Sequence, residues 1–174
     1  MGFERIGSET VWEGRIATVR VDRFRYSDGE EAEREVIAHP GAVAVVAHDG
    51  ERLFLVRQPR EAVGEAALLE LPAGKLDEDG EDPLDTAKRE LAEEIGKGAR
   101  SWSKLTSFYT SPGFADEECH VYLATDLYDE SAVADENERI EIVDVPLADV
   151  DSVIRECRDA KSLVGLLWFR AFQA

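Results

Sequence analysis

The chain has 174 residues, 44% of them hydrophobic, which is enough for one domain with a sizeable core. It carries 38 acidic against 20 basic residues, a net charge of −18, and such a surface repels nucleic acids and other polyanions. Its two cysteines, Cys119 and Cys157, are too few for a disulfide framework and lie outside any metal-binding spacing. Composition therefore counts against a nucleic-acid-binding protein and against a disulfide-stabilised scaffold.

The charge balance and the N-terminus indicate where the protein works. Only five basic residues are lysines, and an acidic, lysine-poor composition suggests a salt-rich cytoplasm in which concentrated salt screens the repulsion. The first nine residues lack the basic and apolar parts of a secretory signal, and no apolar run is long enough to span a bilayer. We therefore expect a cytoplasmic protein that has no membrane partner.

Strand-like patterns recur along the chain. They cover residues 10–26, 33–38, 42–47, 52–56, 68–71, 104–109, 119–125 and 140–145. Turn residues at 27–29 and at Asp49-Gly50 are expected to join the first two strands, and then the next two, into hairpins. Helices are predicted near 83–95, 146–157 and 161–172. Helices that fall between and after strands favour an α/β fold, in which a mixed sheet carries helices on both faces.

The first of these helices has the clearest boundaries. Asp82 is a preferred N-cap residue, and Pro83 fits the first helical position because its missing N–H is not needed there. Gly96 is a typical helix stop. We therefore expect a helix that begins at Pro83 and ends near Ile95.

Acidic side chains gather on one face of this helix. At 3.6 residues per turn Glu90, Glu93 and Glu94 share a face, opposite an apolar stripe that packs on the core. The stripe consists of Leu84, Ala87, Leu91 and Ile95. Like charges so close together repel one another, unless a hard cation such as Mg²⁺ or Mn²⁺ lies among them and bridges to phosphate. A merely solvated acidic helix is the alternative.

Between Gly74 and Gly96 the chain resembles the Nudix hydrolase family. The family's box reads Gly, five residues, Glu, seven residues, then Arg-Glu-aliphatic-any-Glu-Glu-any-Gly-aliphatic. Here six residues separate Gly74 from Glu81, after which the register is kept from Arg89 to Gly96. Lys97 replaces the final aliphatic residue. The extra residue lies before the helix, where a loop absorbs it, so we expect the helix geometry to survive.

This resemblance implies the architecture. It predicts a single Nudix domain over 1–174, an α/β/α sandwich with a mixed β-sheet, preceded by an N-terminal antiparallel hairpin or sheet. The resemblance also implies a homodimer, in which the strands within about 1–40 are the dimerisation element and help to build the substrate pocket of the partner. An isolated hairpin is barely stable and needs a surface to cover, which agrees with this expectation.

Features outside the box resemble the ADP-ribose pyrophosphatase branch of the family. Pro112 follows Gly96 by sixteen residues, although a plain Ser-Pro-Gly turn would also explain it. The stretches 11–14, 39–43 and 159–162 resemble the same branch. The resemblance implies metal-dependent hydrolysis of the diphosphate bond of ADP-ribose to AMP and ribose 5-phosphate.

Two other functions stay open. The same metal helix could act on another nucleoside diphosphate derivative, such as a sugar nucleotide, NADH or a damaged nucleoside triphosphate. From a different class, the domain could sense ADP-ribose without hydrolysing it. A sensor is expected to lose its metal carboxylates, whereas this chain keeps Glu90, Glu93 and Glu94.

The resemblance also implies the metal ligands. The backbone carbonyl of Ala73 would bind Mg²⁺, with Mn²⁺ as the alternative, together with Glu90 and Glu94. Glu93 would be an additional ligand or a supporting catalytic group. Arg89 is expected to orient these carboxylates by ion pairing.

Further residues are expected to contact the substrate or its attacking water. A general base in this branch lies on a loop before the last strand, where the best candidate is Glu136, with Glu138 in reserve. A solvated acidic loop is the alternative for both. Substrate contacts are expected from Arg60, which could instead form a surface ion pair, and from the residues Glu70, Pro112, Gly113 and Phe114.

Overall fold

The structure is a computed structural model that describes residues 2–76, 80–132 and 139–172. The chain divides into two compact units. The first unit comprises Met1–Gly41 and Tyr109–Glu118, and the second comprises Ala42–Phe108 and Cys119–Ala174. The two units are described separately below.

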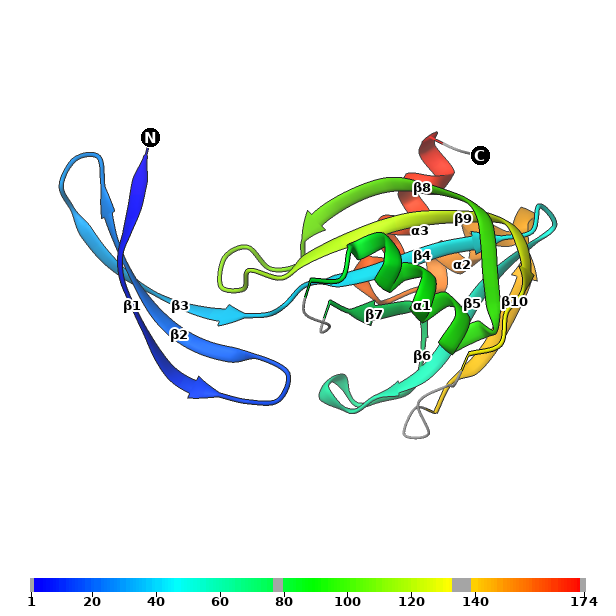
Figure 1. Ribbon diagram of the computed structural model, residues 1–174, viewed down its shortest axis with the longest axis horizontal. Helices are drawn as coiled ribbons and strands as arrows, with labels where there is room; N and C mark the ends of the chain where they lie inside the picture. Colours follow the sequence, from blue (N-terminus) through cyan, green and yellow to red (C-terminus); the bar gives the residue numbers. More distant parts are fainter. Residues whose placement is uncertain (1, 77–79, 133–138, 173–174) are drawn as a thin grey trace. The chain divides into compact units, whose positions relative to one another are not determined.

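The first unit contains a three-stranded antiparallel sheet, drawn in blue and cyan in Figure 1. Its strands are β1 (Phe3–Glu13), β2 (Thr18–Tyr26) and β3 (Glu31–Ala38), in the order β1-β2-β3. The predicted hairpin between β2 and β3 is confirmed, and Gly29 has a left-handed φ of +91° in its turn.

The prediction of one strand over 10–26 was wrong, because the chain reverses between β1 and β2. The Gly14 N–H donates a hydrogen bond to the carbonyl of Ala17 at 3.0 Å and closes this turn. A Cβ added to Gly14 would lie 2.0 Å from the ring of Trp12. The indole therefore packs directly over a backbone that has no side chain. The alternating pattern continues across this turn, so it conceals the break.

The second unit holds a seven-stranded mixed sheet with the main order β10-β5-β4-β9-β8 (Figure 1). Its strands are β4 (Ala42–His48), β5 (Arg52–Arg60), β6 (Glu65–Glu70), β7 (Ala73–Lys75), β8 (Lys97–Tyr109), β9 (Glu118–Asp129) and β10 (Glu141–Pro146). Strands β4 and β9 run parallel, whereas β5 pairs antiparallel with β4, β6 and β10. Strand β7 pairs antiparallel with β4. All the strands expected in this part of the chain are present.

Among the described residues of this unit, three helices cover the sheet. They are α1 (Pro83–Ile95), α2 (Val150–Glu156) and α3 (Ala160–Phe172), with short 3₁₀ turns at Glu61–Val63 and Leu147–Asp149. The helix expected over 146–157 therefore begins with a 3₁₀ turn before α2. No described helix is long and apolar enough to cross a membrane.

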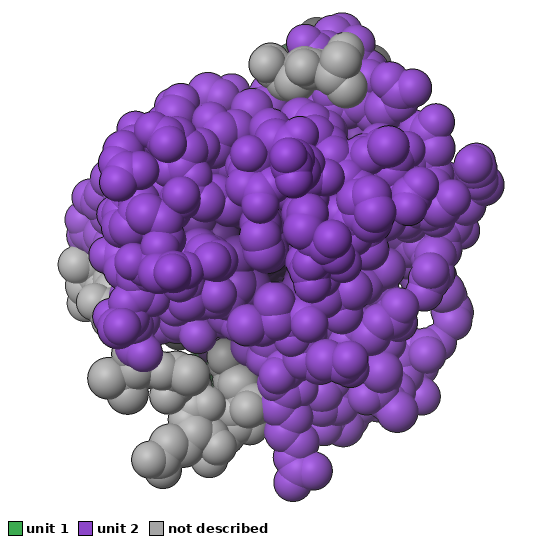
Figure 2. Space-filling view, turned by 90° about the vertical axis from the view of Figure 1, so that its right-hand side faces the viewer, with its two compact units in different colours: residues 1–41, 109–118 green, residues 42–108, 119–174 purple. Residues whose placement is uncertain are grey.

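Strand β4 lies at the centre of the core and faces two apolar layers. Ala42, Ala44 and Val46 belong to a buried cluster with residues of α2 and α3, whereas Val43 and Val45 belong to a second cluster with residues of α1. Alternate residues of a strand point to opposite faces, so an almost wholly apolar strand can serve both layers. The α/β/α sandwich with a mixed sheet is thereby confirmed (Figure 1). Figure 2 shows one face of this closely packed second unit.

Candidate active site

Helix α1 begins and ends where the sequence predicts. The carboxylate of Asp82 accepts a hydrogen bond from the N–H of Leu84 at 2.9 Å, and Pro83 is the first helical residue. At the other end Gly96 adopts a left-handed φ of +66°. The predicted apolar stripe packs on the sheet, which turns the acidic residues of the helix toward β7 and the surface.

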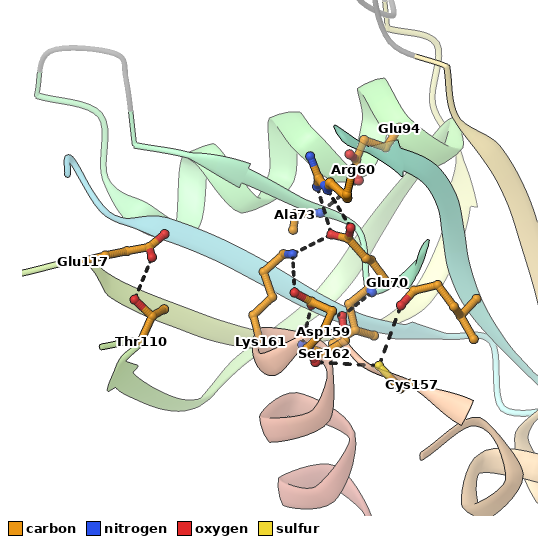
Figure 3. Close-up of polar contacts among 12 residues, drawn as sticks. Arg60, Glu70, Ala73, Glu94, Thr110, Glu117, Cys157, Asp159, Lys161 and Ser162 are labelled. Atoms are coloured by element: carbon orange, nitrogen blue, oxygen red, sulfur yellow. Dashed lines mark hydrogen bonds and ion pairs between the residues drawn. The ribbon is translucent and has the colours of Figure 1, made fainter. Parts of the chain in front are cut away.

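Two carboxylates of α1 reach strand β7. Glu94 is buried, and its Oε2 accepts a hydrogen bond from the backbone N–H of Ala73 at 2.9 Å (Figure 3). Glu90 lies so close to Gly74 that a Cβ added there would be 2.0 Å from its carboxylate carbon and from Oε1. Glycine is therefore required at position 74 for Glu90 to lie against the strand. The structure thus brings together three of the expected metal ligands, Ala73, Glu90 and Glu94.

Arg89 links the remaining acids of the motif. Its Nη1 donates to Oε1 of Glu90 at 2.9 Å and to Oε2 of Glu93 at 3.1 Å, while Nη2 lies 3.3 Å from Oε2 of Glu81. Burial lowers the pKa of Arg89, but the hydrogen bond with Glu81 and the nearby negative charges outweigh it and raise the pKa overall. The expected ion pairs of Arg89 are therefore present. Glu81 also accepts a hydrogen bond from the hydroxyl of buried Thr86 at 2.8 Å, a contact that the sequence did not predict.

The oxygens near α1 and β7 can be compared with what a metal ion needs. Carboxylate and carbonyl oxygens are the donors that hard divalent cations prefer. Within the described ranges, no group of three or more His, Cys, Asp or Glu side chains is gathered as a metal site. Carbonyl and carboxylate oxygens suit a divalent cation. Its ligands would come from the carbonyl of Ala73 in β7 and from the carboxylates of α1.

Arg60 and Glu70 form a bidentate ion pair. Nε and Nη2 of Arg60 donate to Oε1 and Oε2 of Glu70 at 2.6 and 2.9 Å (Figure 3). Glu70 is wholly buried, and its Oε2 also accepts from Nζ of Lys161 at 2.5 Å. Burial raises the pKa of Glu70, but the hydrogen bond from Arg60 and the charge of Lys161 outweigh it and hold the pKa below its usual value.

The sequence pointed to Arg60 and Glu70 as two separate substrate contacts. The structure joins them, and it adds Lys161, which was singled out only within the stretch 159–162. Because both oxygens of the Glu70 carboxylate already have cationic partners, the exposed edge of this group is provided by Arg60, whose side chain is 40% exposed.

The expected substrate residues Pro112, Gly113 and Phe114 lie in the first unit. The N–H of Phe114 donates to the carbonyl of Ser111 at 3.0 Å, so the turn considered as the alternative is present. The same residues line a cavity of about 520 Å³, together with Arg20 and other residues of the first unit. Pro112, Gly113 and Phe114 therefore form a turn and also line a cavity, so the turn does not exclude a role in substrate binding. The candidate bases Glu136 and Glu138 lie outside the described residues.

Comparisons with known proteins agree with this arrangement. Residues 38–164 match the model of the NUDIX domain family. The chain is 40% identical to the ADP-ribose pyrophosphatase of Bacillus subtilis (strain 168), and it is 38% identical to the methanol dehydrogenase activator of Bacillus methanolicus. Each of these alignments covers 97% of this chain and 93% of the relative.

A solved structure of an ADP compounds hydrolase matches with a TM-score of 0.85 at 28% identity, over 98% of this chain and 93% of that chain. The family match includes all of α1, both strands that carry Arg60 and Glu70, and β7. The chain therefore belongs to the Nudix family and is an enzyme that hydrolyses phosphorus-containing anhydrides.

Proposed function

We propose that the enzyme is an ADP-ribose pyrophosphatase, which hydrolyses the diphosphate bond of ADP-ribose to AMP and ribose 5-phosphate. The observation that carries this proposal is the closeness of an anion-binding group to the acidic helix. Glu94 of this helix accepts a hydrogen bond from the N–H of Ala73 at 2.9 Å. Arg60 pairs with Glu70, three residues before Ala73, so the guanidinium and the acidic helix meet at the same short segment (Figure 3). A metal-bound diphosphate needs both kinds of group side by side, carboxylates for the cation and a guanidinium for the phosphate oxygens.

Nudix hydrolases generally need a divalent metal ion. We propose Mg²⁺, with Mn²⁺ as a substitute, held by the carbonyl of Ala73 and by Glu90 and Glu94, with Glu93 as an additional ligand or supporting group. When bound, the metal supplies positive charge that offsets the charge of the diphosphate. This role explains why several carboxylates remain close together on one short helix.

The side chains of the enzyme have separate tasks in this proposal. Arg60 binds phosphate oxygens through the N–H groups that do not bind Glu70. Glu136, or Glu138 in its place, accepts the proton of the attacking water. Pro112, Gly113 and Phe114 contact the nucleoside or ribose end of the substrate.

We further propose that the enzyme is a homodimer that works in the cytoplasm. Large apolar side chains of the first unit are exposed, including Phe3 at 69% and Trp12 at 57%. Exposed apolar groups of this size are typical of surfaces that another chain covers. Light scattering at assay concentration tests the dimer, since a predominantly monomeric species would contradict it, and fractionation of the source cells tests the location.

A panel of substrates tests the activity. The purified enzyme is incubated with ADP-ribose, sugar nucleotides, NADH and 8-oxo-dGTP, with Mg²⁺ or Mn²⁺ in high salt, and a coupled phosphatase releases phosphate from the products. We expect kcat/KM to be highest for ADP-ribose. A higher value for another compound would assign the enzyme to that substrate, and tight binding of ADP-ribose without turnover would identify a sensor.

A further inference from the structure

The segment before α3 and the first turn of that helix contact the last two residues of β6, Leu69 and Glu70, and the residue that follows them, Leu71. The Sγ of Cys157 lies 3.7 Å from the carbonyl oxygen of Leu69. Nζ of Lys161 bonds the carboxylate of Glu70 at 2.5 Å, and the N–H of Leu71 donates to Oγ of Ser162 at 2.7 Å (Figure 3). The carbonyl of Leu69, the side chain of Glu70 and the N–H of Leu71 are therefore all held by residues between 157 and 162.

Asp159 fixes the side chains that make these contacts. Its Oδ2 accepts hydrogen bonds from the N–H and the hydroxyl of Ser162, at 2.9 and 2.6 Å. Its Oδ1 lies 3.0 Å from Nζ of Lys161. The carboxylate thus caps the start of α3 and also gives the ammonium group a second partner. Burial lowers the pKa of Lys161, but Asp159 and Glu70 outweigh it and raise the pKa, so the ammonium stays charged.

The four ionic side chains of this network balance one another in charge. Arg60 and Lys161 carry two positive charges, and Glu70 and Asp159 carry two negative charges. Both carboxylate oxygens of Glu70 are thereby bonded although the residue is wholly buried. Loss of one cation would leave a buried charge with too few partners, which is strongly unfavourable.

The orientation of Arg60 depends on this carboxylate. The guanidinium uses Nε and one N–H of Nη2 for Glu70, and within the described residues its other N–H groups make no hydrogen bond. The guanidinium is planar, so when Nε and Nη2 are fixed by Glu70 the remaining N–H groups point in a defined direction. Oε2 of Glu70 accepts from Arg60 and from Lys161, so the two cations share one oxygen of this carboxylate.

We propose that Lys161 is a positioning residue, which acts through Glu70 to hold the guanidinium of Arg60 in the orientation that receives the diphosphate. Asp159 and Ser162 keep Lys161 and the 69–71 segment in place. The role of Arg60 in this inference rests on the proposed function, whereas the link from Lys161 to Arg60 can be measured without substrate.

The first test is a kinetic cycle of Lys161→Met and Arg60→Ala with ADP-ribose. We expect Lys161→Met alone to lower kcat/KM about thirtyfold, mainly through KM, and to lower it less than threefold when Arg60 is already alanine. Lys161→Arg, which keeps the charge, should retain more activity than Lys161→Met. The matched control is Lys104→Met, an exposed lysine of β8, which should leave kcat/KM unchanged. Multiplicative effects of the two substitutions would overturn the proposal.

The second test measures the N–H of Nε in Arg60 by NMR, with the signal assigned by its loss in Arg60→Ala. We expect slow hydrogen exchange in the parent and in Lys104→Met, and exchange at least tenfold faster in Lys161→Met. Unchanged exchange in Lys161→Met would overturn the proposal. If the parent hydrolyses no nucleoside diphosphate while exchange behaves as expected, the proposed function fails and the positioning role stands.

Should Lys161→Met not fold, a charge-balanced variant replaces it. Glu70→Gln with Lys161→Met removes one charge of each sign, so its melting temperature should be closer to that of the parent. We expect hydrogen exchange at Nε of Arg60 in this double variant to match that in Glu70→Gln alone, because Lys161 acts through the ionised carboxylate. Clearly faster exchange in the double variant than in Glu70→Gln would contradict the inference.

Discussion

Asp22 in the first unit and Glu70 in the second are both buried carboxylates held by two cationic side chains. Asp22 is 1% exposed and accepts hydrogen bonds from the hydroxyl of Ser8 at 2.6 Å, from Arg20 at 2.9 Å and from Arg5 at 3.4 Å. The local solution is therefore the same in both units: a buried charge is tolerated where every oxygen has a charged or polar partner.

The surroundings of the two carboxylates differ. Both apolar clusters of the described structure lie in the second unit, on the two faces of β4. Large apolar side chains are exposed in both units, but those of the first unit belong to a part of the described structure that has no apolar cluster of its own: Phe3, Val11, Trp12, Ile16, Ile37 and Phe114. The hydrogen bonds around Asp22 can fix the geometry of the sheet without an apolar core, but they add little stability to a small sheet by themselves. We therefore expect metal and phosphate chemistry in the second unit, and we expect the first unit to contact a partner chain in addition to the substrate contacts proposed for Pro112, Gly113 and Phe114.

The largest effect is expected from Glu94→Gln in the second unit. The new amide oxygen can still accept the hydrogen bond from Ala73, so the fold should be kept, but a metal would lose an anionic ligand. Turnover should fall about a thousandfold, which is ~4 kcal/mol in activation free energy. Steady-state kinetics with ADP-ribose measures this, and Glu51→Gln in the β4–β5 turn is the control. Turnover within a few-fold of the parent would reject the metal role.

A smaller effect is expected on assembly when Trp12→Ser is made in the first unit. Removal of an exposed indole from a dimer interface should raise the dissociation constant about thirtyfold, or ~2 kcal/mol. Analytical ultracentrifugation over a concentration series measures it. The same substitution at Trp168 of α3, which is 38% exposed, is the control in the second unit. If only Trp168→Ser dissociates the dimer, the dimer interface lies in the second unit and not in the first.

The buried carboxylate of the first unit should matter for stability. Asp22→Asn keeps the size of the side chain but removes the charge that Arg20 and Arg5 face, and should lower the free energy of unfolding by about 2 kcal/mol. Thermal unfolding followed by circular dichroism measures this. Asp151→Asn, in an exposed ion pair with Arg170, should change stability by less than about 0.5 kcal/mol. Equal effects of the two substitutions would contradict the prediction.

The contribution of Asp22 also has a predicted pH dependence. Burial raises the pKa of Asp22, but the hydrogen bonds from Ser8 and Arg20 outweigh it, so the pKa lies below its usual value. A carboxyl group with a lowered pKa in the folded state stabilises the fold above its unfolded pKa, and this contribution is lost as the pH falls through the folded pKa. The difference in melting temperature between the parent and Asp22→Asn should therefore shrink in acid. A constant difference would exclude this linkage.

The smallest expected effect comes from salt and concerns both units. Screening of a net charge of −18 should raise the melting temperature between dilute and molar KCl by about 3 °C, or ~1 kcal/mol. Differential scanning calorimetry over a KCl series measures this shift. No rise in the melting temperature would argue against the salt-rich habitat inferred from the composition.

The fold of the second unit was largely predictable because its signals are local. Asp82, Pro83 and Gly96 mark the ends of α1 through backbone preferences that need no tertiary contact. Strand β4 is apolar along its length, which indicates burial on both faces. In contrast, β1 was only partly found, because the alternating pattern runs through the turn at Gly14 and several apolar residues of β1 are exposed.

The candidate site divides in the same way. The sequence placed Glu90, Glu93 and Glu94 on one helix because their spacing fixes their direction. It could not show that Glu90 lies against Gly74, that Glu94 accepts a hydrogen bond from Ala73, or that Lys161 bonds Glu70. These partners are far apart in the chain, and no periodicity connects them.

From the sequence alone one can predict the acidic helix with its caps, the family motif and the order of strands and helices in the second unit. These depend on backbone preferences and side-chain spacing over a few residues. The tertiary structure alone decided that the N-terminal sheet has three strands and buries Asp22, and that Arg60, Glu70, Asp159 and Lys161 form one network. Those contacts arise only when strands and helices distant in sequence pack together. A buried charge is stable only beside an oppositely charged or hydrogen-bonding group, and here that group comes from another part of the chain.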